Sequence, residues 1–257
     1  MSYGLWLSAA GLQTNEYRQS LTANNLANVE TVGFKRDLAV LRERQVESAA
    51  DPQQQSYSNP LLDAMSGGTW VRPTYTSFEQ GSIEHTGGEH DLAISGDGFF
   101  AVSDGNTDLY TRDGRFTRDP VAGELVMVAG DGRYRLLDEA GHAIAITDAE
   151  LGPVNIAKDG TISQGGTILG KLALVDFEDR TLLRKTGAGL LEYQGSDRPN
   201  QGTGVILSGY LEGSTVDPAT ELINMIEVTR AYELNARMLA LQDETIGLAV
   251  QRVGLIS

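Results

Sequence analysis

Apolar residues toward the C-terminus recur in alternating steps of three and four, which is the pattern of a coiled-coil helix. Asp217 and Pro218 precede them, and an N-cap carboxylate followed by a first-turn proline suits the free amide groups of a helix start. A helix from Pro218 to Val253 is roughly 50 Å long, too long to pack wholly on a small domain. We therefore expect its seam to meet a neighbouring molecule. The seam consists of Leu222, Met225, Thr229, Tyr232, Ala236, Leu239, Asp243, Ile246, Val250 and Val253, weakened by its Thr and Asp.

A second helical pattern lies at the N-terminus. Glu16 and Gln19 interrupt its apolar face. The helix is expected to end near Gly33, which favours the left-handed conformation that closes a helix, or earlier at Asn28. The apolar face consists of Leu5, Ala9, Leu12, Ala23 and Leu26.

The middle of the chain contains short β-favouring runs beside Asp-Gly pairs, the strongest short hairpin signal. Residues 109–117 are expected to form two strands joined by a two-residue turn at Asp113 and Gly114, and the same pattern surrounds Asp159 and Gly160. The other Asp-Gly pairs begin at Asp97, Asp104 and Asp131. Further strands are expected over 92–94, 99–102, 125–128, 143–146 and 172–177.

These patterns predict an α+β protein in four parts. Residues 1–33 form an N-terminal helix, 34–81 an extended connector, 82–213 a central antiparallel β domain and 214–257 a C-terminal helix. The connector prediction depends on residues 45–81, a polar stretch with proline, paired glycines and little periodicity. The N- and C-terminal helices can then meet in one coiled-coil-like layer.

The acidic composition excludes some partners. The 257 residues carry a formal net charge of −15, which repels phosphate backbones and anionic lipid heads, so we expect no nucleic-acid partner. The chain has no cysteine, which excludes disulfides, thiolate nucleophiles and metal sites that contain Cys. No uncharged apolar run reaches the roughly 20 residues that cross a bilayer. With no basic residue before Arg18, the N-terminus lacks the layout of a cleaved secretory signal.

Two glycine-rich motifs match nucleotide-binding patterns by letter only. GDGFFA begins at Gly96, but a dinucleotide fingerprint opens a helix, whereas Phe99 and Phe100 continue as a strand. GGTILGKL places Leu172 where a P-loop needs a Ser or Thr for magnesium. We interpret both motifs as turns.

The candidate metal ligands also lack a complete set. Asp104, Asn106 and Asp108 begin like a calcium loop, but Leu109 stands at the required Gly and Arg115 at the bidentate Glu. The histidines, His85, His90 and His142, are not at helical ligand spacing, and no Ser occupies a G-x-S-x-G elbow. We predict no enzyme activity and no cofactor.

The two ends of the chain resemble the flagellar rod and hook family. ANNLANVETVGFKRD, residues 23–37, is similar to the family's N-terminal signature. GSTVDPATELINMIEVTRAYELNARML, residues 213–239, is similar to its C-terminal motif, although Thr215 replaces the usual Asn. DLAISGDGFFAV, YTRDGRFTRD and GYLEGS in the middle resemble its β domain, so the resemblance covers nearly the whole chain.

The resemblance implies a structural role. In the family the terminal helices form the coiled inner layer of a hollow helical shaft, the β domain packs outside it, and subunits leave through the flagellar export apparatus without a cleaved signal. The implied partners are copies of this chain, neighbouring rod and hook proteins and the export apparatus, and the implied place is the periplasmic rod of the basal body. The implied assembly residues are Leu5, Leu12, Asn24, Asn25, Leu26, Asn28, Gly33, Phe34, Leu222, Met225, Ile226, Arg230, Tyr232, Glu233, Asn235, Ala236, Leu239, Ile246 and Val250.

Some alternatives stay open. The three asparagines of the signature also fit a frayed or capped helix end, and Arg230, Glu233 and Arg237 also fit a solvated helix face. Length favours a rod subunit over the hook and filament-junction proteins, and residues 159–193 resemble the proximal rod type more than the distal. The alternative function is a secreted or periplasmic β-domain adhesin or binding module that oligomerises through its C-terminal helix.

Overall fold

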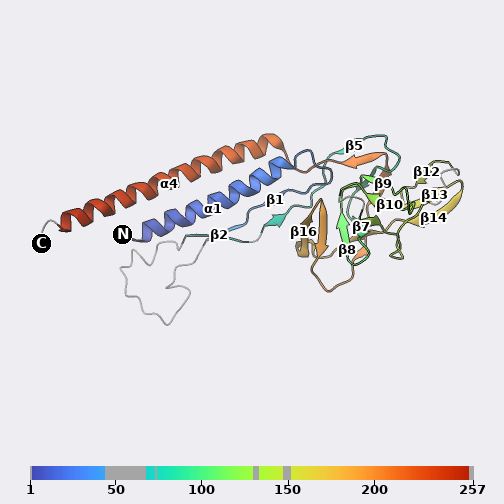
Figure 1. Ribbon diagram of the computed structural model, residues 1–257, viewed down its shortest axis with the longest axis horizontal. Coiled ribbons are helices and arrows are strands. Elements are labelled where there is room, and N and C mark those ends of the chain that lie inside the picture. The colour runs from blue at the N-terminus through green and yellow to red at the C-terminus, as the bar shows by residue number, and fades with distance from the viewer. Residues whose placement is uncertain (1, 44–67, 73, 130–132, 147–151, 255–257) are drawn as a thin grey trace. The chain divides into compact units, whose positions relative to one another are not determined.

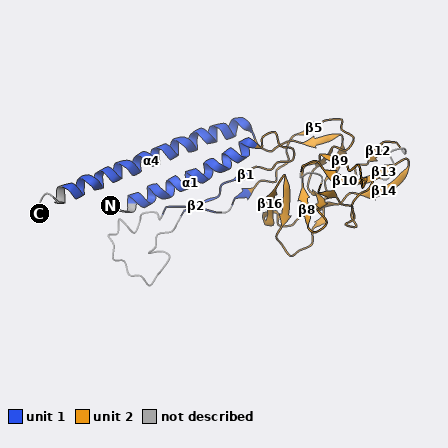
Figure 2. Ribbon diagram, in the orientation of Figure 1, with its two compact units in different colours: residues 1–27, 37–75, 217–257 blue, residues 28–36, 76–216 orange. Residues whose placement is uncertain are grey.

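The computed structural model describes residues 2–43, 68–72, 74–129, 133–146 and 152–254 (Figure 1). The chain divides into two compact units, shown in different colours in Figure 2. The helical unit takes residues 1–27, 37–75 and 217–257, and the β unit takes 28–36 and 76–216. Each unit is therefore built from separate stretches of the chain.

Two long helices dominate the helical unit. α1 spans Ser2–Ala27 and α4 spans Pro218–Gly254, and the two lie side by side (Figure 1). Gly4 lies against Gln242 and Gly11 lies against Asn235, so the helices are antiparallel. The C-terminal helix of the sequence prediction is confirmed.

The start of α4 follows the expected chemistry. The Asp217 carboxylate accepts hydrogen bonds from the amides of Ala219 and Thr220, at 3.2 and 3.3 Å, and from the Thr220 hydroxyl. These bonds satisfy amides that lack a partner inside the helix. The hydrogen-bonded Thr220 side chain, followed by the Ala219 amide, lowers the pKa of Asp217. The carboxylate is therefore held in its charged, capping form.

The N-terminal helix ends at Ala27, at the earlier of the two expected ends. The Asn28 carbonyl accepts from the Thr31 amide at 3.2 Å, and its side chain accepts from the Thr31 hydroxyl at 3.1 Å. These bonds close a turn in place of further helix. Gly33 has φ of +67° and belongs to the β unit.

Short strands accompany the helices in the helical unit. β2 (Leu41–Glu43) pairs antiparallel with β3 (Thr69–Val71), and β1 (Asp37–Leu38) pairs with β4 (Tyr75–Thr76). Gly68, just before β3, lies beside Leu7 and Ala10 of α1. The described ends of the predicted connector therefore form strands, one of them beside α1, and residues 44–67 and 73 lie outside the described residues.

The β unit contains antiparallel strands throughout its described residues. Its largest sheet has the order β16-β17-β8-β7-β11-β10-β9, and in addition β15 pairs with β7 and β18 pairs with β15. β12, β13 and β14 form a second sheet, and the pairs β19–β6 and β20–β5 complete the unit. The strands are β5 (Ile83–His85), β6 (Leu92–Ser95), β7 (Phe99–Ser103), β8 (Asp108–Thr111), β9 (Phe116–Arg118), β10 (Leu125–Met127), β11 (Arg135–Leu136), β12 (Val154–Ile156), β13 (Thr161–Gln164), β14 (Thr167–Lys171), β15 (Leu174–Asp176), β16 (Leu183–Gly187), β17 (Leu190–Tyr193), β18 (Asn200–Gln201), β19 (Val205–Ser208) and β20 (Tyr210–Glu212), with the short helix η2 (Arg180–Leu182) before β16.

Strand β7 is buried on both faces. Phe100 and Val102 belong to the main core with Leu92, Leu125 and Ile162, whereas the neighbouring Phe99 belongs to a separate cluster. Alternate residues of a strand point to opposite faces, so the Phe99–Phe100 pair fills both cores. The second cluster is largely aromatic and includes Phe78, Tyr110, Phe177 and Tyr193.

One of the two predicted hairpins is confirmed. β12 and β13 pair with Ile156 opposite Ile162, and Gly160 in their turn has φ of +88°. The predicted hairpin at Asp113 is wrong, because β8 pairs with β7 and β17, whereas β9 pairs with β10. Gly114 lies against the backbone of Leu92, and its carbonyl oxygen accepts a hydrogen bond from the Leu92 amide at 3.0 Å. A tertiary contact therefore takes the place of the local turn.

The remaining expected strands are partly found. Residues 92–94, 99–102 and 125–127 are strands, and the last expected strand is limited to Leu174–Asp176. Residues 143–146 make only isolated bridges from Ala143 to Leu137 and from Ala145 to Glu124. The Asp131 pair lies outside the described residues. The α+β fold class, with terminal helices and a central antiparallel β region, is confirmed.

Candidate assembly surface and chain junction

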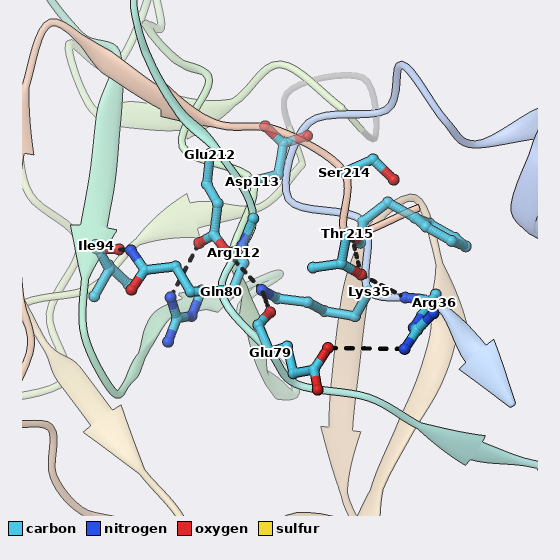
Figure 3. A network of polar contacts seen from close by, with 12 residues as sticks. Lys35, Arg36, Glu79, Gln80, Ile94, Arg112, Asp113, Glu212, Ser214 and Thr215 are labelled. Atoms are coloured by element: carbon cyan, nitrogen blue, oxygen red, sulfur yellow. Dashed lines mark hydrogen bonds and ion pairs between the residues drawn. The ribbon is translucent and has the colours of Figure 1, made fainter. Parts of the chain in front are cut away.

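The β unit holds a buried cluster of charges centred on Glu212, the last residue of β20 (Figure 3). One carboxylate oxygen of Glu212 lies 2.6 Å from the Lys35 ammonium and the other lies 3.0 Å from the Arg112 guanidinium. The side chains are 0%, 3% and 4% exposed, respectively. Charges this deeply buried are stable only when they are paired and hydrogen-bonded.

Backbone groups complete the coordination of these charges. The Gly81 amide donates to Glu212 Oε1 at 2.8 Å, Lys35 donates to the Glu79 carbonyl, and Arg112 donates to the Gly96 carbonyl at 2.8 Å. Burial lowers the pKa of Lys35 below its ordinary value, and the Glu212 carboxylate opposes this shift. The cluster is built to hold three fixed charges in place.

The chain segments around the cluster are bonded to one another. The Gly33 amide donates to the Glu212 carbonyl at 2.7 Å, and the Thr215 amide donates to the Phe34 carbonyl at 3.0 Å. The Arg36 amide donates to the Thr215 hydroxyl at 2.9 Å. The segment that follows α1 in sequence therefore runs beside the segment that precedes α4.

Within the helical unit, Asn25 makes a two-point contact with the backbone of Asp37. Its side-chain amide donates to the Asp37 carbonyl at 2.9 Å and accepts from the Asp37 amide at 3.0 Å. This geometry imitates a strand pair, which explains why an asparagine is buried in the last turn of α1. Residues 28–36, which belong to the β unit, are the chain between these two partners.

The structure places the residues of the N-terminal signature in different surroundings. Asn25, Gly33 and Phe34 are buried, and the Lys185 ammonium lies 4.1 Å from the centre of the Phe34 ring. Asn24 is exposed on α1, and Asn28 holds the turn after it. The leucines at 5, 12 and 26 are half-buried.

The buried face of α1 is made of small and polar residues. Ser8, Asn15 and Thr22 are buried at steps of seven, and Gly4 and Gly11 meet the amide side chains of α4. Glycine allows those long side chains to lie close to the helix backbone. The apolar face named from the sequence is half-buried or exposed in the single chain, because α4 covers the face of small and polar residues.

The covered face of α4 also differs from the predicted seam at alternate positions. Asn235 and Gln242 meet α1, and the buried Val228 and Glu221 continue this row at steps of seven toward the start of the helix. Leu222, Thr229, Ala236 and Asp243 of the predicted seam each lie one residue further along, and the contact of that seam with a neighbouring molecule stays a prediction. Met225, Leu239 and Ile246 fall between members of the row and are half-buried.

An apolar stripe follows the opposite face of α4. Its side chains are 51–62% exposed and recur in steps close to multiples of the helical repeat. The stripe consists of Ile223, Ile226, Leu234, Met238, Leu241 and Leu248. Six large apolar side chains in one row form an exposed patch of the kind that marks an interaction surface.

The predicted assembly residues of the C-terminal helix divide between the two faces. Met225, Asn235, Leu239 and Ile246 lie on or next to the covered face. The exposed ones are Leu222, Ile226, Arg230, Tyr232, Glu233 and Val250, and Ala236 is half-buried. The sequence argument missed Ile223, Leu234, Met238, Leu241 and Leu248, because it followed a single seam.

The motifs that resembled ligand sites have structural explanations. Phe99 and Lys171 lie in strands β7 and β14 and open no helix. The Asp104 carboxylate accepts from the amides of Asn106 and Thr107 at 2.8 Å each, which lowers its pKa and closes the turn between β7 and β8. Among the described residues, no group of three or more His, Cys, Asp or Glu could hold a metal ion.

Sequence reasoning also missed the charge cluster. Its members come from three quoted segments, since Lys35 lies in the N-terminal signature, Arg112 in YTRDGRFTRD and Glu212 in GYLEGS. Their membership in these three motifs was the available signal. The separations of 100 and 177 residues that join Glu212 to its partners leave no local pattern.

A β unit with two long terminal helices, one of which presents an exposed apolar stripe, is an arrangement typical of a structural protein. Three family models match in the order of the chain. "Flagella basal body rod protein" covers residues 7–35, "Flagellar hook protein FlgE/F/G D1 domain" covers 93–164, and "Flagellar basal body rod FlgEFG protein C-terminal" covers 207–252. The matches span both ends and the β unit.

Curated relatives are similar over nearly their whole length. The flagellar basal-body rod protein FlgF of Caulobacter vibrioides is 37% identical over 260 residues, which cover all of both chains. FlgG of Buchnera aphidicola subsp. Acyrthosiphon pisum is also 37% identical, over 94% of this chain and 96% of the relative. FlgF of Mesorhizobium japonicum is 30% identical over 99% of both. The chain belongs to the flagellar basal-body rod protein family.

Family membership decides the main question of function. The protein is a structural subunit of the flagellar basal-body rod, and the adhesin alternative is set aside. The family is one of structural proteins and is not a known enzyme family. In the part of the chain that the structure describes, no helix has the length and apolar character needed to span a membrane.

Proposed function

We propose that the subunit assembles into the hollow axial shaft through its terminal helices, with the outward stripe of α4 as the main contact to neighbouring copies. The observation that carries this proposal is which residues the two helices bury and which they expose. α1 buries Ser8, Asn15, Thr22 and Asn25, whereas α4 exposes its stripe of large apolar residues. A helix pair that functioned alone would show the opposite arrangement.

The energetic argument favours burial of this stripe in a neighbour. Covering a Leu, Ile or Met side chain fully contributes about 1.5 to 3 kcal/mol, and each of the six side chains is about half exposed. The row runs along most of α4, so one helix of a neighbouring subunit can cover it continuously. Repetition of this contact from copy to copy gives an open helical assembly.

The remaining parts of the proposal follow the resemblance. The terminal helices α1 and α4 form the inner assembly layer of the shaft, and the β unit forms its outer part. The partners are copies of the chain, neighbouring rod and hook proteins and the flagellar export apparatus, which takes the subunit without a cleaved signal to the periplasmic rod. We place it in the proximal rod, with the distal rod as the alternative, and propose that it acts without catalysis or cofactor.

Assembly can be tested in cells that express single substitutions on the stripe. Leu241→Asp places a carboxylate where a neighbour would bury it, at an effective cost of several kcal/mol per interface. Leu241→Met keeps the position apolar and of similar volume, so it is the matched control. Electron microscopy of purified basal bodies should find rods with Leu241→Met and none with Leu241→Asp, although both subunits are produced. Normal rods and swimming with Leu241→Asp would show that this stripe is not the assembly contact.

A further inference from the structure

The chain passes between the two units at four points, next to residues 27, 36, 75 and 216. The β-unit segments that adjoin these points are residues 28–36, 76–81 and 212–216. All three segments meet at the charge cluster of Glu212 (Figure 3). Every entry to and exit from the β unit is therefore bonded to one site.

The bonds among these segments form a closed set. Segment 28–36 is bonded to segment 212–216 through the Gly33 amide and the Lys35 ion pair. It is also bonded to segment 76–81, because the Ser77 amide donates to the Arg36 carbonyl at 2.9 Å. Segment 76–81 is bonded to 212–216 through the Gly81 amide. Each segment thus contacts the other two, and Arg112 ties the set to the body of the sheet.

The hydrogen bonds and ion pairs of the cluster require fixed directions between their partners. An apolar side chain at position 212 would contribute as much burial, since buried ion pairs are seldom more stabilising than well-packed hydrophobic groups. Only a carboxylate can accept simultaneously from an ammonium, a guanidinium and a backbone amide in fixed directions. The cluster therefore specifies where these segments lie more than it adds stability.

We propose that Glu212 is a positioning residue that fixes the paths by which the chain enters and leaves the β unit. Neutralising it should release these segments while the body of the unit stays folded. This inference concerns the single chain and does not depend on the proposed assembly contact.

Spin labels on the full-length chain can measure this effect, since the chain has no cysteine of its own. One pair joins segment 28–36 to the body of the unit, with Glu30→Cys and Val121→Cys at exposed positions. The control pair joins Val121→Cys to Ile168→Cys, which lies in the body and is 70% exposed. Electron–electron double resonance then gives a distance distribution for each pair.

The test variant is Glu212→Gln, and the matched control is Glu124→Gln, which removes a partly exposed carboxylate paired with Arg135. With Glu212→Gln we expect the Glu30–Val121 distribution to broaden at least about twofold and the Val121–Ile168 distribution to stay narrow. Glu124→Gln should change neither. If Glu212→Gln does not fold, Lys35→Met decides by the same criteria, because it frees segment 28–36 and leaves Glu212 paired with Arg112.

Two results would overturn the proposal. An unchanged Glu30–Val121 distribution would mean that Glu212 does not hold segment 28–36 in place. Equal broadening of both distributions would mean that the cluster maintains the core of the unit and has no separate positioning role.

Discussion

Lys35 and Glu212 form a buried ion pair of 2.6 Å although they lie 177 residues apart in the chain. Lys35 belongs to the N-terminal signature and lies after α1 in the chain, and Glu212 ends the last strand before α4. The pair therefore joins the two ends of the β unit's sequence. Arg112 pairs with the same carboxylate. Removal of Glu212 therefore leaves two charges without a partner, whereas removal of Lys35 leaves Glu212 paired with Arg112.

Removal of the carboxylate should be the most damaging change in the cluster. Glu212→Gln leaves Lys35 and Arg112 buried without a counter-charge, at a cost of about 3 to 5 kcal/mol in the free energy of unfolding. Lys35→Met leaves Glu212 paired with Arg112 and the Gly81 amide, so its cost should be smaller, about 1 to 2 kcal/mol. Urea unfolding of the full chain, followed by the β-sheet circular dichroism signal, measures both. A Lys35→Met variant that is as unstable as Glu212→Gln would contradict this ranking.

The same lysine predicts a pH dependence. Burial holds the pKa of Lys35 below its ordinary 10.5, so at pH values just below 10.5 the unfolded chain binds more protons at this group than the folded chain. The free energy of unfolding attributable to Lys35 therefore rises as the pH rises through that window. Lys35→Met lacks this group and serves as the reference. Urea titrations from pH 7 to pH 10 should give a difference between wild type and Lys35→Met that grows in favour of wild type, and a constant or shrinking difference would refute the assignment.

Sequence reasoning succeeded where the determining interactions are local. Asp217 and Pro218 start α4 as expected, because a helix cap involves only residues within one turn. The hairpin around Gly160 was also predicted, since its turn residues and flanking strands are adjacent in the chain. At Asp113 the same Asp-Gly pair led to a wrong hairpin prediction. Gly114 is fixed by a contact with Leu92, which no local pattern reveals.

The charge cluster and the helix faces were less accessible to sequence reasoning. Lys35, Arg112 and Glu212 are residue types normally assigned to the surface, and only the fold brings them together in the interior. Likewise the buried polar face of α1 depends on which face of α4 it meets. Asn235 and Gln242 cover Gly11 and Gly4, a pairing that hydrophobic periodicity cannot detect.

The contact between Gly11 and Asn235 should limit what α1 tolerates. A Cβ atom at Gly11 would lie 3.0 Å from the Asn235 amide, so Gly11→Leu forces the side chain or the helix to move, at about 1 to 3 kcal/mol. Gly247 on α4 has no atom near the added Cβ, so Gly247→Ala should stabilise the helix by up to about 1 kcal/mol. Thermal unfolding followed at 222 nm should therefore shift downward for Gly11→Leu and upward for Gly247→Ala. A Gly11→Leu variant with an unchanged transition would show that α1 and α4 do not pack at this point.

The two faces of α4 predict opposite phenotypes for neighbouring leucines. Leu239 is half-buried and lies between Asn235 and Gln242 on the face toward α1, whereas Leu241 is 52% exposed on the outward stripe. Leu239→Asp should weaken the helix pair of the single chain, because a carboxylate on the covered face loses water without gaining a partner. Leu241→Asp stays solvated in the single chain and should leave its helicity unchanged.

Both variants should nevertheless fail to build rods, Leu239→Asp because its helices are misplaced and Leu241→Asp because its neighbour cannot cover the charge. Circular dichroism of the dilute subunit at 222 nm, compared with rod formation in cells, separates the two causes. Loss of helicity in Leu241→Asp, or full helicity in Leu239→Asp, would mean that the inward and outward faces of α4 have been assigned the wrong way round.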